Sequence, residues 1–142
     1  GFYRACDELG LEIPEEYVRE GVYHDPDRCA ELTQELLKLE VPPTCILMPD
    51  DISSIGGGNA IRRMGFRLPG DVSEAGYDGI QLSSVMNPPL TTYRQDTQAL
   101  GKTAAAKLIE LIEKPRTALV DRILIPGRLV EGASVQAIEP QE

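Results

Sequence analysis

Several side chains in this sequence could bind a polyhydroxylated small molecule. Asp50, Asp78 and Gln95 offer carboxylate and amide groups, which form paired hydrogen bonds with adjacent hydroxyls. Tyr23 offers an aromatic face, which packs on the C–H face of a sugar ring. These residue types predict a site for a sugar or a similar polyol. A structural alternative carries equal weight, because Asp50 or Asp51 could cap the following helix and Tyr23 could pack on the surface.

No arrangement of residues predicts catalysis. The single histidine, His24, has no serine or cysteine partner in a recognisable motif. The run of glycines at 56–58 follows a predicted strand, but it lacks the third glycine of a dinucleotide loop and the lysine of a phosphate loop. Asp50 and Asp51 with Lys102 suggest a phosphoacceptor receiver domain, but there the acidic pair follows the first strand, whereas here it lies mid-chain. We therefore expect a protein that is not an enzyme.

The cysteines indicate neither a disulfide framework nor a metal site. Cys6, Cys29 and Cys45 are an odd, widely spaced set, with no CxxC pair or histidine cluster beside them. We expect reduced, mostly buried thiols in a cytoplasmic protein. No metal ion and no cofactor is expected.

Alternating strand-like and helix-like periodicity predicts the elements that position these residues. Apolar runs predict short strands at 17–23, 44–48, 72–77, 91–95, 121–125 and 128–130. Amphipathic patterns predict helices at 2–9, 26–39, 52–64 and 97–113, the last with an exposed stripe of Leu100, Ala104, Leu108, Leu111 and Ile112. The alternation predicts an α/β fold, an open parallel sheet with helices on both faces. Ligands bind beyond the carboxyl ends of such strands, and the candidate residues lie there.

Length and charge exclude other partners. The chain has 142 residues, 14 Lys and Arg and 23 Asp and Glu, for a net charge of −9. A surface this acidic repels the phosphate backbone of DNA or RNA and an anionic membrane surface. No apolar run approaches the length of about 18 residues that a membrane helix needs. The size fits one soluble domain or half of a larger one.

Five segments, in order, carry a family resemblance. They are Gly1-Phe2-x-x-Ala5, Met48-Pro49-Asp50-Asp51-x-x-x-x-Gly56, Gly65-x-x-x-Pro69-x-Asp71-Val72-Ser73, Gly76-Tyr77-Asp78, and Pro88-Pro89-Leu90-Thr91-Thr92 with Gln95 and Leu100-Gly101. Together they resemble the LacI/GalR family of bacterial transcription regulators, from Gly1 to about Ser134. The effector domain of that family resembles a type I periplasmic sugar-binding protein, with two α/β lobes, three crossovers and a ligand cleft between the lobes.

The resemblance implies a division of the chain. Residues 1–95 would form the C-terminal lobe of the effector-binding domain, 96–126 a helix and strand that belong to the N-terminal lobe, and 127–142 a returning strand and tail. The helix-turn-helix DNA-binding head would lie upstream of Gly1, so the chain would begin inside a longer gene product. The stripe on the helix at 97–113 would then lack its native partner and would pack on another copy of the chain or on its own sheet.

The resemblance also implies roles for five cleft residues. Tyr23 stands where the family has an aromatic residue that packs on the effector, and Asp50 stands at the Asn or Asp after the third strand. Asp78 matches the acidic residue of Gly-Tyr-Asp, which hydrogen-bonds the effector. Gln95 and Thr97 match crossover positions that face the cleft, and Thr97 replaces a frequent aromatic residue. The family's cleft arginine lies before Gly1.

A homodimer is implied as well. Its interface would involve the helix at 52–64 and the loop after Asp78, at Ile52, Ile55, Asn59, Ile80 and Leu82. Three features depart from the family pattern: Glu74 in a usually apolar strand, Gly57 and Gly58 in the interface helix, and Gly132 where an arginine is usual. The glycines would weaken the interface helix, because each interior glycine costs on the order of 1 kcal/mol relative to alanine.

The implied function is effector sensing in a cytoplasmic regulator. A small molecule, in particular a sugar, would close the lobes and change DNA affinity through the upstream head, because the two conformations bind effector and operator unequally. One alternative is a sugar-binding protein of an ABC transport system with the same fold. A second is an enzyme on the same sheet, against which the absence of a nucleophile–base pair counts.

Overall fold

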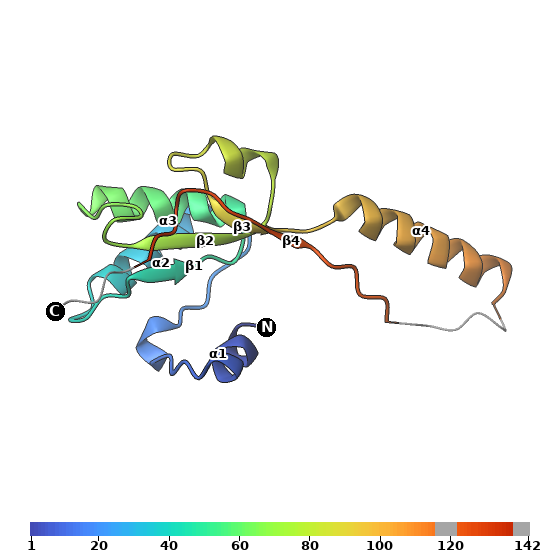
Figure 1. Ribbon diagram of the computed structural model, residues 1–142, viewed down its shortest axis with the longest axis horizontal. Coiled ribbons are helices and arrows are strands. Elements are labelled where there is room, and N and C mark those ends of the chain that lie inside the picture. Colours follow the sequence, from blue (N-terminus) through green and yellow to red (C-terminus); the bar gives the residue numbers. More distant parts are fainter. Residues whose placement is uncertain (116–121, 138–142) are drawn as a thin grey trace.

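The computed structural model describes residues 1–115 and 122–137 and contains one four-stranded sheet (Figure 1). The strands are β1 (Cys45–Leu47), β2 (Ser73–Asp78), β3 (Thr91–Arg94) and β4 (Arg128–Val130), in the spatial order β1-β2-β3-β4. β1, β2 and β3 run parallel, whereas β4 is antiparallel to β3. The predicted open α/β sheet is confirmed, with the last strand making it mixed.

Two long helices cover one face of the sheet. They are α2 (Pro26–Leu37) and α3 (Asp51–Arg63), which pack against each other. Their apolar side chains meet those of β1 and the start of β2 in one core, composed of Cys29, Leu36, Leu37, Ile46, Met48, Ile61 and Val72. Burial of these side chains is the dominant stabilising contribution.

Aspartates begin the three longest helices, because a carboxylate accepts the otherwise unpaired N–H groups of the first turn. Asp25 accepts from Arg28 N, Asp50 from Ser53 N, and Asp96 from Ala99 N at the start of α4 (Thr97–Glu113). The predicted caps of α2 and α4 are thus confirmed.

The glycines of α3 have a packing role that the sequence did not suggest. A Cβ atom on Gly56 would collide with the backbone of Pro26, and one on Gly57 with the Met48 side chain. All three glycines at 56–58 are buried. They let α3 approach α2 and the sheet closely, so their loss of helix propensity is offset by contact, and they do not lie on the exposed side of the helix.

The strand predicted at 17–23 is wrong. The chain forms helix α1 (Phe2–Leu9), a 3-10 turn at Glu15–Tyr17 and an irregular segment before α2. In the described structure β1 is the edge of the sheet, so this segment has no paired strand beside it, and a strand requires such a partner. An apolar cavity of about 510 Å³ separates α1, α2 and β1.

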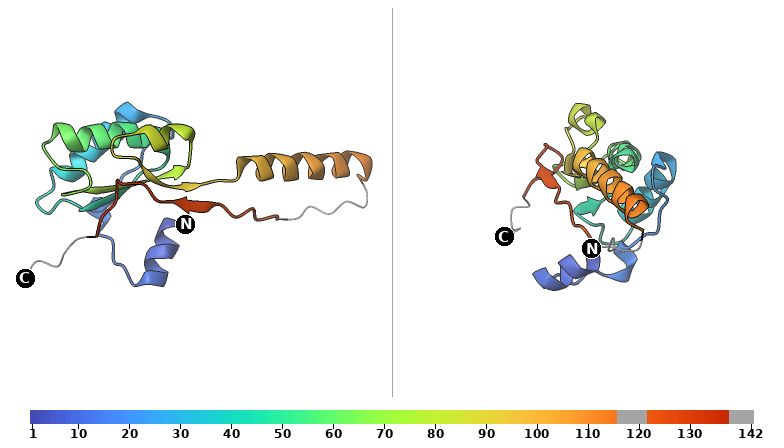
Figure 2. Two further views of the ribbon diagram at one scale, coloured as in Figure 1. Left: turned by 45° about the horizontal axis from the view of Figure 1, so that its top comes forward. Right: turned by 90° about the vertical axis from the view of Figure 1, so that its right-hand side faces the viewer.

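Helix α4 projects from the sheet without covering it (Figure 2). None of its residues is buried, and Leu108 and Ile112 are exposed. In the structure the stripe on α4 does not fold back on its own sheet. The strand predicted at 121–125 is also wrong for 122–125, which are irregular, while residue 121 lies outside the described residues.

Ser134 fastens the C-terminal segment to the sheet. It is buried, its hydroxyl donates to Glu74 O at 2.6 Å, and that hydroxyl accepts from Thr91 N at 2.8 Å. Gly132 N donates to Thr91 Oγ1, and a Cβ atom at Gly132 would collide with the backbone of Pro89 and Leu90. The departure at Gly132 is therefore accommodated by a close backbone contact.

Two further expectations can be compared with the structure. The three cysteines are free; Cys6 and Cys29 are buried and Cys45 is exposed. None of the described helices combines the length and the apolar character required to cross a membrane.

Candidate functional site

The candidate residues lie along one edge of the sheet, at the carboxyl ends of β1, β2 and β3, on the side from which α4 departs (Figure 1). Asp50 follows β1, Asp78 ends β2, and Gln95 follows β3. Parallel strands place their carboxyl ends together, which is why residues far apart in sequence meet here. The structure brings them into two adjacent groups.

Asp78 and Gln95 form the first group. Gln95 Nε2 donates a hydrogen bond to Asp78 Oδ1 at 2.6 Å, and Gln95 N donates to Asp78 O at 3.2 Å. The φ angle of Asp78 is 104°, in a region that non-glycine residues rarely adopt. Such strain persists where the surrounding contacts enforce it and is concentrated at functional sites. The carboxylate is therefore held in a fixed direction beside the Gln95 amide.

Gly79 and Arg94 lock this turn. Arg94 Nε donates to Gly79 O at 3.0 Å, and Gly79 itself has a φ angle of 67°. A Cβ atom at Gly79 would collide with the Arg94 side chain. Glycine is thus required here both for its backbone conformation and for the space that Arg94 occupies.

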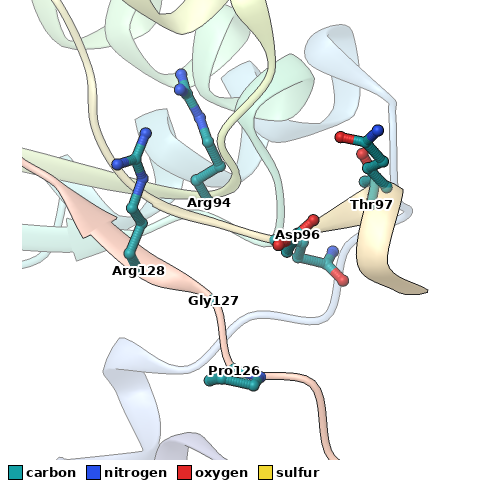
Figure 3. A pocket seen from close by; sticks show the side chains of 8 residues that line it. Arg94, Asp96, Thr97, Pro126, Gly127 and Arg128 are labelled. Carbon is teal, nitrogen blue, oxygen red and sulfur yellow. The ribbon is translucent and has the colours of Figure 1, made fainter. Parts of the chain in front are cut away.

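An open pocket of about 370 Å³ lies where the crossovers leave the sheet (Figure 3). Its walls come from the end of β3, the start of α4 and the approach to β4, and the lining residues are Arg94, Gln95, Asp96, Thr97, Gln98, Pro126, Gly127 and Arg128. Gln95 and Thr97, both expected at the cleft, line it, and Asp78 reaches it through its bond to Gln95. Tyr23 and Asp50 do not line this pocket.

Asp50 occupies the second group and is only 1% exposed. Its carboxylate accepts from Ser53 N at 2.8 Å, from Ser53 Oγ at 2.8 Å and from His24 N at 3.0 Å. Burial acts to raise the pKa of Asp50, but these hydrogen bonds outweigh it and lower the pKa below its usual value. The geometry is that of the capping alternative, with both oxygens engaged inside the protein.

Tyr23 lies in the turn that Asp50 holds. Its side chain is 70% exposed, and the next residue, His24, has a φ angle of 58°. Because His24 N donates to Asp50, the buried carboxylate fixes the turn from which the Tyr23 ring projects. Asp50 therefore positions Tyr23 rather than presenting its own oxygens to the outside.

Sequence reasoning gave no specific role to Asp51, the second residue of the acidic pair. It is 1% exposed, accepts from Thr92 Oγ1 at 2.6 Å, and accepts from Ile80 N at 2.9 Å. Burial raises the pKa of Asp51. This carboxylate joins α3 to β3 and to the loop after Asp78, so it fixes the spacing of the site. The doubled Asp after an apolar run was its only sequence signal.

Sequence reasoning also missed the two arginines of the pocket. Arg94 and Arg128 are directly opposite each other in the β3–β4 pairing. That pairing joins residues distant in sequence, so no local pattern could have found it. Within residues 1–115 and 122–137, no group of three or more His, Cys, Asp and Glu side chains could hold a metal ion.

The residues expected at a dimer interface lie together on the surface. Ile52, Ile55 and Asn59 follow one side of α3, where they are not buried. Ile80 and Leu82 lie in and next to the 3-10 turn Gln81–Val85, and Leu82 is exposed. The glycines at 56–58 face the opposite, buried side, so they leave this surface stripe intact.

Comparison with known proteins adds a family to this geometry. The model of the periplasmic binding protein-like domain matches residues 1–135. The HTH-type transcriptional repressor PurR of Mannheimia succiniciproducens is 36% identical over 138 residues, covering 97% of this chain and 41% of the repressor. The chain thus spans well under half the length of this curated relative. The expectation of a non-enzymatic protein is confirmed by such relatives, which are transcriptional repressors.

Two solved structures share the fold. The transcriptional regulator CelR in complex with cellobiose has a TM-score of 0.86 at 25% identity, covering 94% of this chain and 40% of the regulator. A Lac repressor dimer bound to operator and the anti-inducer ONPF has a TM-score of 0.86 at 29% identity, covering 96% of this chain and 46% of that one. These similarities favour a regulator over the transport alternative.

Proposed function

Because the chain belongs to the periplasmic binding protein-like family, within the LacI/GalR group of regulator effector domains, we propose that it senses a sugar or sugar-like effector for a transcription regulator. The observation that carries the proposal is the Asp78–Gln95 pair at the mouth of the 370 Å³ pocket. A carboxylate and an amide held 2.6 Å apart present adjacent acceptors and donors, which suits two neighbouring hydroxyls.

In this proposal each cleft residue has a distinct part. Asp78 and Gln95 bind hydroxyls directly, and Thr97 leaves space beside them at the start of α4. Tyr23 packs its exposed ring on the effector. Asp50 acts through its hydrogen bond to His24 N, which holds the Tyr23 turn in place. The CelR–cellobiose complex supports a carbohydrate in the cleft of a protein with this fold.

The effector acts by lobe closure. Residues 96–126 belong to a second lobe, to which α4 is attached; its lack of any buried residue supports this assignment. An effector that contacts both lobes binds the closed state better and shifts the population toward it. Operator affinity changes through the upstream DNA-binding head by the same coupling free energy. The regulator is cytoplasmic.

The regulator acts as a homodimer through α3 and the loop after Asp78. The uncovered stripe of Ile52, Ile55 and Asn59 continues into Ile80 and Leu82, and Asp51 ties the two segments together through Ile80 N. Closure that moves the loop at Asp78 is thereby transmitted to the interface. The Lac repressor dimer supports this mode of assembly.

A thermal-shift screen tests the proposal on the full product of the gene that encodes this chain. The panel contains sugars, polyols and nucleobases. We expect a sugar or polyol to raise the melting temperature, and the Asp78→Asn variant to lose that shift. Asn tolerates the positive φ angle at this position, so the fold is retained. Asp7→Asn, an exposed position on α1, is the control that keeps the shift.

The alternative results are equally clear. A shift produced only by nucleobases would replace the sugar with another effector class. A shift that survives in Asp78→Asn would place the effector elsewhere in the protein and contradict the site proposed here.

A further inference from the structure

Two arginines meet at the pocket in an unusual arrangement. Arg94 ends β3 and Arg128 begins β4, and the two are direct partners in the antiparallel register. Opposite residues in such a pair have Cα atoms about 4.5–5.5 Å apart. Both side chains extend to the same side of the sheet (Figure 3). Like charges directly opposite each other destabilise a sheet, so this pair requires a compensating interaction.

The described part of the chain does not supply that compensation. Neither arginine forms an ion pair with any described residue; Arg94 donates to the carbonyl of Gly79, and Arg128 has no hydrogen-bond partner there. The two nearest candidates are engaged elsewhere, because Asp78 accepts from Gln95 and Asp96 caps α4. This is notable in a chain with 23 acidic and 14 basic residues.

The same pocket receives a third positive contribution from α4. This helix has 17 residues, and its first two, Thr97 and Gln98, line the pocket. The N-terminus of a helix carries a partial positive charge and unpaired N–H groups, which favour anions. Asp96 is the one carboxylate on the pocket wall, and it is turned to Ala99 N.

We propose that this pocket binds the phosphate group of a phosphorylated effector, held by Arg94 and Arg128. The inference rests on the proposed function and names the chemical class of its ligand. A guanidinium group binds phosphate through two parallel N–H···O bonds, and a tetrahedral phosphate has enough oxygens to face two guanidinium groups at once. Asp78 and Gln95, at the same pocket, then bind the hydroxyls of the attached sugar.

Binding of inorganic phosphate to the 142-residue chain provides the first test. Phosphate is titrated at constant ionic strength, balanced with chloride, and followed by NMR chemical shifts. Arg128→Gln removes an exposed guanidinium that has no partner in the described structure, so the fold is preserved. The matched control is Arg63→Gln, at the exposed end of α3. We expect Arg128→Gln to weaken binding by about ten- to a hundredfold and Arg63→Gln to leave it unchanged.

A second arm separates a free ion from an effector group, by comparing a hexose 6-phosphate with its parent hexose and with inorganic phosphate. The proposal requires the hexose phosphate to bind more tightly than either, with loss in Arg128→Gln. Equal responses of Arg128→Gln and Arg63→Gln, no saturable binding, or a hexose phosphate no tighter than inorganic phosphate would overturn it. If the parent hexose alone stabilises the protein through Asp78, the phosphate inference fails while the proposed function stands.

Discussion

Glu74 and Gly58 face each other across the contact between β2 and α3. A Cβ atom on Gly58 would lie 2.7 Å from Glu74 Oε2, and the Glu74 side chain is fully buried. Neither of its carboxyl oxygens has a hydrogen-bond partner among the described residues. Burial raises the pKa of Glu74 to about 8, although the charge of Arg62 opposes the rise. The absence of a side chain at Gly58 thus provides the space for a buried, protonated acid.

Stability should therefore fall as the pH rises from about 4.5 toward 8. The folded protein keeps the Glu74 proton up to a pKa of about 8, whereas the unfolded chain releases it near 4.5. Between these values the folded state binds more protons, so its contribution is complete below pH 4.5 and is lost through pH 8. Each pH unit in this window costs up to about 1.4 kcal/mol.

Urea unfolding at pH 5 and pH 8 measures this effect. Glu74→Gln keeps the shape of the side chain without its charge, so the difference in free energy of unfolding between the two proteins isolates Glu74. We expect the variant to gain several kcal/mol relative to the original chain as the pH rises. Parallel pH profiles in the two proteins would show that Glu74 is ionised in the fold.

Substituting Gly58 with alanine should destabilise the protein by about 1–3 kcal/mol, because the new methyl group would collide with Glu74. Gly101→Ala in α4 is the matched control, since a Cβ atom there meets nothing within 4 Å. In an open helical position alanine is favoured over glycine by roughly 0.5–1 kcal/mol. Thermal unfolding distinguishes the two.

A double-mutant cycle identifies the cause of the Gly58 effect. Combining Gly58→Ala with Glu74→Ala should cost less than the sum of the single changes, because removing the acid vacates the space. Strict additivity would mean that the two residues do not compete for that space.

Loss of the Asp50 side chain should cost about 3 kcal/mol. It removes a helix cap, worth about 1 kcal/mol, and leaves buried donors of Ser53 and His24 unpaired. Asp25→Ala removes the cap of α2, whose hydrogen bond is exposed, and should cost only about 1 kcal/mol. Chemical unfolding compares the two, and equal losses would show that Asp50 is an ordinary surface cap.

Self-association should depend on the exposed stripe of α3. Ile55→Glu places a charge at the centre of the proposed interface and should shift the chain toward monomer by at least tenfold in dissociation constant. Val41→Glu, at a residue 66% exposed and away from the stripe, is the control. Sedimentation velocity measures both. An unchanged distribution for Ile55→Glu would move the interface to another surface.

Sequence reasoning predicted the fold well where signals were local. The aspartate caps at Asp25 and Asp96 and the apolar run before Asp50 located three elements, because capping and strand formation depend on neighbouring residues. It failed at 17–23, where apolar residues resemble a strand but no partner strand lies beside them. Strand formation is a property of two segments, and only one was visible.

The site was predicted in part for a similar reason. Asp78 and Gln95 were found because each follows a strand in the same sheet, and the structure pairs them. The burial of Asp50 was left open, since the sequence does not show that His24 N and Ser53 would occupy its oxygens. Arg128 was missed because its position opposite Arg94 arises only from the long-range pairing of β4 with β3.

The most direct test of the account is the affinity of the effector for two proteins. The compound found by the thermal-shift screen is titrated calorimetrically into the 142-residue chain and into the full gene product. A cleft between two lobes predicts at least hundredfold weaker binding to the chain, since half of the contacts are elsewhere, and predicts that Asp78→Asn weakens binding to the full product. Micromolar binding to the chain alone, or full affinity in Asp78→Asn, would contradict a cleft of this kind.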